Sequence, residues 1–133
     1  MFGHGPSHGI RALFPVVFDR VVDVLRGCKY ASNIYFTVLD VKPRVAVFIE
    51  GRYSLMVEGF MTAIALVIER GDSTEVRIVT QSNNPYGSRG GDLGMSRSYA
   101  VDILDSLTSG LHVSPSDVVN VDYMDSSKSH LLG

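Results

Sequence analysis

Two segments of the chain repeat apolar residues at intervals of three or four positions, the pattern of a helix with one buried face. The first covers residues 9–27, and its Pro15 favours a helix that begins between residues 11 and 14, with the proline in the first turn. The second covers residues 96–109, and Gly110 is suited to end it. We therefore expect one helix near each end of the sequence.

Between and after these helices, the apolar residues alternate or run together over short stretches rich in β-branched and aromatic residues, as in strands. The predicted strands are 33–41, 44–50, 53–58, 60–70, 75–81 and 118–124. Turn signals separate several of them, at Lys42–Pro43, at Gly51–Arg52 and at residues 71–74. Alternatively, residues 52–70 form one long strand that bends at a bulge near Gly59.

This order predicts an α+β fold, a mostly antiparallel twisted sheet of about five to six strands with an N-terminal and a C-terminal helix packed on one face. The expected element order is α-β-β-β-β-β-α-β. Short connections force antiparallel neighbours, whereas the last strand follows a helix and can pair in parallel with an earlier strand. A chain of 133 residues suits a single domain, 1–133, with residues 1–9 and 125–133 as flexible tails.

The strands carry apolar side chains on both faces, since Tyr35, Leu39, Phe48 and Met56 have apolar neighbours on the opposite side. Two helices with one apolar stripe each can cover only one face of such a sheet. We therefore expect the second face to meet another subunit, a curled part of the same sheet, or a ligand.

Composition narrows the classes of protein. A net charge of −2 argues against nucleic-acid or membrane binding driven by bulk charge. Cys28 is the single cysteine, which rules out an intrachain disulfide and a thiolate zinc cluster. No signal-peptide pattern opens the sequence, and the apolar stretch 60–68 is far shorter than a membrane helix. We expect a cytoplasmic protein, and the excess of Arg over Lys weakly suits a high-temperature source.

The glycine-rich segment 83–95 is the first candidate site, because glycines let backbone amides approach an anion and a helix N-terminus follows. Its predicted anion-binding residues are Tyr86, Arg89, Gly90, Gly91 and Arg97. The glycine spacing, G-x-x-G-G-x-x-G, matches neither the dinucleotide nor the P-loop motif, and Asp92 would repel a phosphate. The alternative is a long surface loop whose glycines only turn the chain.

The second candidate is a polar and aromatic pocket on one sheet face. Its members are Tyr35, Glu50, Arg52, Tyr53 and Glu58. The alternative is that these charged groups lie at strand ends in solvent, where strand charges usually lie.

Other chemistry has weaker support. His4 and His8 have a metal-compatible spacing, but glycines and a proline surround them, so we predict exposed histidines in a frayed terminus and no metal site. Cys28 follows a predicted helix C-terminus, which does not favour a reactive thiolate, so we predict a structural role for it and no catalytic residue. No cofactor is predicted. Nucleic-acid binding is not expected, because carboxylates accompany the arginines of the strands.

These observations favour a non-catalytic, self-associating module that binds a small ligand, with a homodimer as the expected assembly and an anion as the candidate ligand. One alternative is an enzyme or binding protein for a phosphorylated or nucleotide-like small molecule, which would use residues 83–95. A second alternative is a structural assembly protein without a ligand. Whether the protein is an enzyme stays open.

Overall fold

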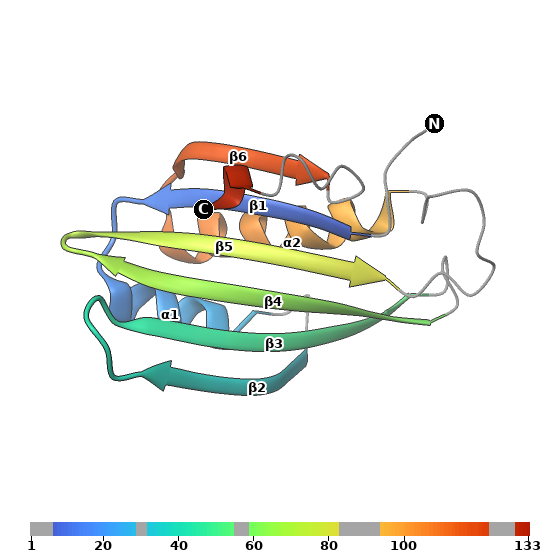
Figure 1. Ribbon diagram of the computed structural model, residues 1–133, viewed down its shortest axis with the longest axis horizontal. Helices are drawn as coiled ribbons and strands as arrows, with labels where there is room; N and C mark the ends of the chain where they lie inside the picture. Colours follow the sequence, from blue (N-terminus) through green and yellow to red (C-terminus); the bar gives the residue numbers. More distant parts are fainter. Residues whose placement is uncertain (1–6, 29–31, 55–58, 83–93, 123–129) are drawn as a thin grey trace.

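The protein is an α+β fold, described here by a computed structural model over residues 7–28, 32–54, 59–82, 94–122 and 130–133 (Figure 1). Six strands form one sheet, and two helices lie against it. The elements are β1 (Ser7–Phe14), α1 (Phe18–Arg26), β2 (Ser32–Leu39), β3 (Val45–Ser54), β4 (Gly59–Arg70), β5 (Ser73–Ser82), α2 (Met95–Leu111) and β6 (Ser116–Asp122). The predicted fold class is confirmed.

The strands lie in the order β2-β3-β4-β5-β1-β6, and every neighbouring pair is antiparallel. The strands β2 to β5 follow one another as hairpins, as the short connections require. The last strand, β6, pairs antiparallel with β1, so the parallel pairing that its position after a helix would allow does not occur. The sequence did not predict β1 as a partner, because the N-terminal segment has the periodicity of a helix.

That strand is β1, which replaces the first half of the predicted N-terminal helix. Ile10, Ala12 and Phe14 are buried, whereas Arg11 and Leu13 between them are partly exposed, as in a strand with one face on the core. Pro15 disfavours helical geometry at Phe14, so α1 begins only at Phe18. The element order is therefore β-α-β-β-β-β-α-β.

The structure describes residues 7–9 and 130–133 of the two predicted tails. His8 is buried in β1, and its Nε2 lies 3.0 Å from Oδ1 of Asn120 in β6, so the expectation of an exposed histidine is wrong. At the other end, residues 130–132 form a helical turn in which Leu132 is buried. His4 and residues 125–129 lie outside the described residues.

Two predicted boundaries also differ. Gly51 and Arg52 do not form a turn; they continue β3, where Gly51 pairs with Thr62 of β4. β3 therefore extends to Ser54, and β4 begins at Gly59, where the sequence suggested a bend in one long strand; residues 55–58 lie outside the described residues. Gly110 lies inside α2, which ends at Leu111, with His112 in the left-handed conformation at φ 58°.

Both helices cover one face of the sheet, as predicted (Figure 1). The helix α2 packs on β5 and β1, α1 packs on β4 and β5, and the two helices touch each other. Their apolar stripes meet alternate residues of the strands, and this layer is the core. Its largest buried members are Ile10, Phe14, Phe18, Leu25, Phe48, Met61, Ile78, Tyr99, Ile103, Leu107 and Leu111.

Candidate functional site

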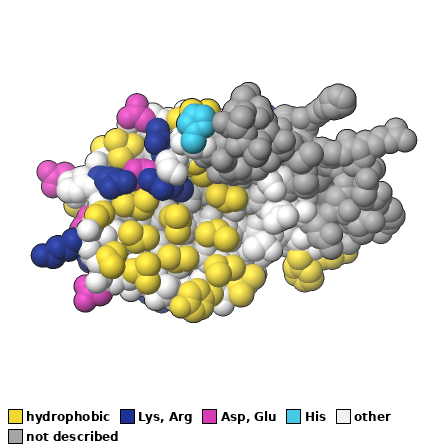
Figure 2. All heavy atoms as spheres, in the orientation of Figure 1, with side chains coloured by type: hydrophobic (Ala, Val, Ile, Leu, Met, Phe, Trp, Pro, Cys, Tyr) yellow, Lys and Arg dark blue, Asp and Glu magenta, His cyan; other side chains and the backbone are white. Residues whose placement is uncertain are grey.

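The outer face of the sheet, which points away from both helices, is apolar over β2, β3 and β4. Residues opposite each other on neighbouring strands share a face, so the partners Tyr35–Ile49, Ile49–Ile64 and Tyr53–Phe60 all lie on this side. The exposed members are Ile34, Tyr35, Leu39, Tyr53, Phe60 and Ile64, which we call the outer apolar surface. Figure 2 shows hydrophobic side chains gathered over this part of the sheet.

The exposure of these side chains is large, from 42% for Ile64 to 68% for Phe60. Six large side chains that each expose roughly half of about 200 Å² contribute on the order of 600 Å² of apolar surface. Patches of that size on a monomer are often functional. Tyr53 and Phe60 meet edge to face, with ring centroids 5.4 Å apart, which adds to the continuity of the surface.

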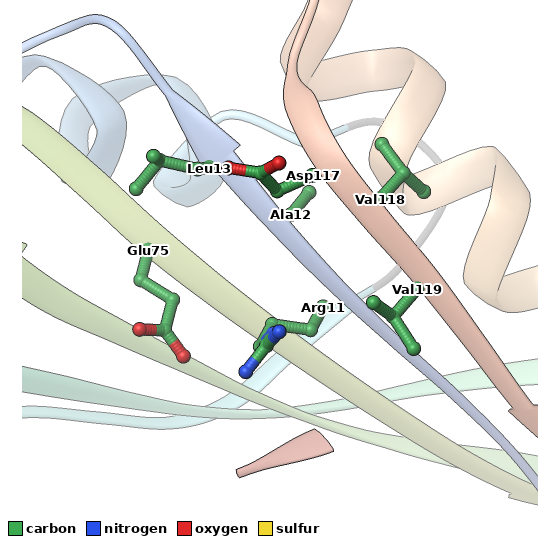
Figure 3. Close-up of a pocket in the computed structure, with 7 residues that line it drawn as sticks. All are labelled: Arg11, Ala12, Leu13, Glu75, Asp117, Val118 and Val119. Atoms are coloured by element: carbon green, nitrogen blue, oxygen red, sulfur yellow. The ribbon is translucent and has the colours of Figure 1, made fainter. Parts of the chain in front are cut away.

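The other half of the outer face is polar and hollowed. A groove of about 370 Å³ lies where β5, β1 and β6 adjoin (Figure 3). Arg11, Leu13, Glu75, Asp117 and Val119 line it together with Ala12 and Val118. The outer face thus combines an apolar surface on β2–β4 with a charged groove on its remaining strands.

An irregularity in strand pairing shapes this groove. Arg11 pairs with Val119 and Leu13 pairs with Ser116, so β6 contains one residue more than β1 over the same interval. Such a bulge bends a strand and re-aims its side chains. Asp117 lies in the bulge with φ 51°, a left-handed backbone that Asp tolerates better than most residues.

The charges around the groove divide into paired and unpaired groups. Glu75 binds Arg77, with Oε2 2.6 Å from Nε, and Arg70, with Oε1 3.0 Å from Nη2. Burial opposes ionisation of Glu75, but these hydrogen bonds outweigh it and hold its pKa below the ordinary value. The side chains of Arg11 and Asp117, by contrast, make no hydrogen bond or ion pair with any described residue.

A second unusual group lies inside the core, between β3 and α2. The carboxyl of Glu50 is fully buried, and neither of its oxygens has a hydrogen-bond partner among the described residues. The hydroxyl of Tyr99 is also buried without a partner. Burial raises the pKa of Glu50 to about 7. Burial, followed by the charge of Glu50, raises the pKa of Tyr99 well above its ordinary value.

An ion pair between Arg52 and Asp102 lies next to the buried Tyr99. Arg52 lies over the ring of Tyr99, 4.4 Å from its centroid, and its Nη1 donates to Oδ2 of Asp102 at 2.7 Å. Both side chains of the ion pair are partly exposed, whereas Glu50 is enclosed. A carboxyl in such a place can hold a proton near neutral pH, because desolvation disfavours its charged form.

The structure divides the pocket that the sequence suggested. Tyr35 and Tyr53 lie on the outer apolar surface, whereas Glu50 and Arg52 face the helices. Because Gly51 and Arg52 continue the strand, Glu50 and Tyr53 are an odd number of positions apart and point to opposite faces. Glu58 lies outside the described residues.

The glycine-rich segment falls almost wholly outside the described residues, and with it Tyr86, Arg89, Gly90 and Gly91. Arg97 is exposed in the first turn of α2, whose N-cap Gly94 has a φ of 77°. No side chain caps the start of α2; Ser96 is buried there, and its carbonyl accepts a hydrogen bond from Oγ1 of Thr80 at 2.7 Å.

The sequence did not predict this groove, in part because the helical periodicity of residues 9–27 hides the strand that carries Arg11 and Leu13. The signal that could have found Arg11 is the alternation of buried Ile10, Ala12 and Phe14 with it. Asp117 gives no comparable signal, since only the three-dimensional pairing of β6 with β1 shows the bulge.

Comparisons with known proteins give one structural similarity. No protein-family model matches the chain, and no curated protein matches it. Among solved structures, the chain is similar to the adenosylmethionine decarboxylase from Aquifex aeolicus VF5, at 15% sequence identity and a TM-score of 0.49. The match covers 90% of this chain and 88% of that one.

Two further findings concern the described part of the chain. Neither described helix combines the length and the apolarity that crossing a membrane takes. Within the same residues, no three His, Cys, Asp or Glu side chains cluster in a way that could hold a metal ion.

Proposed function

We propose that the protein is a non-catalytic, self-associating module that binds a small ligand. In this proposal, the outer apolar surface of one copy packs against that of a second copy, and the groove beside it takes the ligand. The observation that carries the proposal is the continuous, exposed apolar surface on β2–β4.

The chemistry of the outer apolar surface favours a second copy over a different partner. A two-fold contact places the same patch on both sides, so the patch must be complementary to itself. An apolar patch without charges meets that condition, and its Tyr and Phe side chains are typical of interface centres. The ion pairs of Glu75 on β5 with Arg77 and Arg70 lie to one side of it, where the polar rim of an interface would be.

The area of the outer apolar surface also agrees with the area that a stable interface buries. A stable interface buries about 800 Å² on each partner. The six exposed side chains of the outer apolar surface contribute on the order of 600 Å², and the half-buried Val45, Val47, Ile49, Leu66 and Val79 lie between and beside them. Two sheets packed face to face would exclude water from this area as in a β-sandwich.

The described part of the chain leaves this surface open. Leu132 is buried, and Gly133 lies beside the side chain of Arg77 on β5, so the C-terminal turn covers the outer face at β5 and β1. A second copy would remove the outer apolar surface from water, and burial of apolar surface contributes a favourable free energy of roughly 25 cal/mol per Å². This gain supports association of two copies.

The groove supports the ligand-binding half of the proposal. Small-molecule sites are concave, with volumes of about 300–1,000 Å³, and combine apolar walls with a few polar groups. The groove has a volume of about 370 Å³, with Leu13 and Val119 as apolar walls and Arg11 and Asp117 as charged groups.

Self-association is tested with a charge placed in the outer apolar surface. We expect analytical ultracentrifugation to find a dimer for the unmodified protein and a monomer for Ile64→Glu, because the charge would be buried without a partner. The matched control is Val17→Glu, which puts the same group at another exposed aliphatic residue, the valine before α1, and should stay dimeric.

Phe60→Ser provides a second variant with little effect on the fold, since Phe60 is 68% exposed. Circular dichroism verifies that all variants fold. An unmodified protein that is monomeric at high concentration, or folded Ile64→Glu and Phe60→Ser variants that both remain dimeric, would overturn the proposed association.

Ligand class is tested by thermal shift with nucleotides and sugar phosphates. We expect no specific stabilisation, because the charges of the groove do not favour a simple anion. Stabilisation that disappears in Arg97→Ala would instead support a phosphate site at the N-terminus of α2.

A further inference from the structure

The groove between β1 and β6 contains two opposite charges that no described residue neutralises. Arg11 is partly buried in the groove, and Asp117 lies across from it on the neighbouring strand. The other carboxylate that lines the groove, Glu75, already binds two other arginines. An unpaired cation and an unpaired anion therefore line the same hollow.

The two charged side chains line the same groove but do not pair with each other. Arg11 pairs with Val119, and Asp117 lies two positions further along β6. Diagonal neighbours of this kind have backbones roughly 7–8 Å apart. Asp117 lies in the bulge of β6 with a left-handed φ, and its side chain lines the groove beside Leu13 (Figure 3).

From this arrangement, we infer that the groove binds a small zwitterion of the α-amino-acid class, with its carboxylate on Arg11 and its ammonium group on Asp117. The inference rests on the ligand-binding half of the proposed function and is independent of self-association. A guanidinium can donate two parallel hydrogen bonds to a carboxylate, which fixes the orientation of the ligand. Leu13 and Val119 would contact an aliphatic side chain.

Charge complementarity favours a zwitterion over a ligand that carries only a carboxylate or only an ammonium group. A plain carboxylate would gain Arg11 but approach the negative charge of Asp117. A plain amine would gain Asp117 but approach the guanidinium of Arg11. Only a ligand with both charges satisfies both residues, and a volume of about 370 Å³ admits a molecule of amino-acid size.

Isothermal titration calorimetry with leucine tests the inference against two analogues that each lack one charge. The analogues are 4-methylpentanoate, which lacks the ammonium group, and 3-methylbutylamine, which lacks the carboxylate. We expect leucine to bind at least tenfold more tightly than either analogue. Equal binding of leucine and 4-methylpentanoate, or no binding of leucine at millimolar concentration, would overturn the inference.

Two isosteric variants locate the site. Arg11→Gln and Asp117→Asn should each weaken leucine binding at least tenfold, and Asn tolerates the left-handed backbone at position 117. Asp105→Asn, on the exposed face of α2, is the matched control and should leave the affinity unchanged. Unchanged affinity in both groove variants would overturn the inference.

Repeating the titration with Ile64→Glu separates the inference from the proposed association. Leucine binding that persists in this variant supports the groove as a site within one copy. Absence of leucine binding in a protein that still dimerises would remove the inference and leave the association standing.

Discussion

Gly110 of α2 lies so close to Val24 of α1 that a Cβ at position 110 would overlap Cγ1 of Val24. This contact is where the two helices touch, and it explains a glycine within the last turns of α2. Gly normally costs a helix about 1 kcal/mol relative to Ala. At this position, the missing side chain permits the close approach.

We therefore predict that Gly110→Ala destabilises the protein although it raises helix propensity. Overpacking costs about 1–3 kcal/mol, so the free energy of unfolding in urea should fall by roughly 1–2 kcal/mol once the gain in propensity is subtracted. Ser109→Ala, one residue earlier and exposed, is the control and should be neutral or slightly stabilising.

The double variant Gly110→Ala/Val24→Ala tests the stated cause. Removing the Val24 methyl groups makes room for the new Cβ, so the two substitutions together should be less destabilising than the sum of their separate effects. Strict additivity would contradict an overlap between these two residues.

The buried carboxyl of Glu50 should make stability depend on pH. Its pKa is about 7 in the folded protein, against 4.5 for an exposed Glu, so the folded state keeps a proton that the unfolded state releases. Stability from this group is complete below pH 4.5 and is lost as the pH rises through about 7. The loss by pH 8 is on the order of 3 kcal/mol.

Glu50→Gln should flatten this dependence, because the amide has a similar shape and does not ionise. Urea unfolding at pH 5, 6, 7 and 8 is the measurement. The opposite sign is expected for Glu69, whose pKa is held low by its hydrogen bond to Arg44, so its stabilising effect is lost towards acid pH. An unchanged slope in Glu50→Gln would show that Glu50 does not titrate in this range.

Tyr99→Phe isolates the buried hydroxyl. Because this hydroxyl has no hydrogen-bond partner among the described residues, its removal relieves a desolvation penalty. We expect the melting temperature to stay equal or rise slightly, whereas Tyr99→Ala, which leaves a cavity, should cost about 3–5 kcal/mol. A loss of more than about 1 kcal/mol in Tyr99→Phe would indicate a hydrogen bond to the hydroxyl.

The sequence predicted the fold class, the hairpin of β4 and β5, and α2, because these segments show only one periodicity. The N-terminal segment is compatible with two periodicities, that of a helix and that of a strand. Ile10, Leu13, Phe14 and Val17 fit a helix, whereas Ile10, Ala12 and Phe14 fit a strand. Tertiary pairing with β5 and β6 decides between them, and such long-range pairing is not visible in a local window.

The residues of the predicted pocket lie on two sheet faces for a related reason. Strand alternation places Glu50 and Tyr53 on opposite faces, but this argument requires one uninterrupted strand. Gly51 and Arg52 resemble a turn in sequence, so the parity between the two residues could not be used. The expectation that one sheet face carries uncovered apolar residues did not depend on that detail, and the outer apolar surface is present.

The position of β1 in the sheet constrains how the chain reaches its native state during synthesis. Both neighbours of β1 come from much later in the sequence, since Ile10 pairs with Ile78 on one side and with Asn120 on the other. At translation rates of about 5–20 residues per second, the nascent segment waits several seconds for either neighbour. The β3–β5 hairpins can therefore assemble on the ribosome first, and the earliest strand made is inserted among the last.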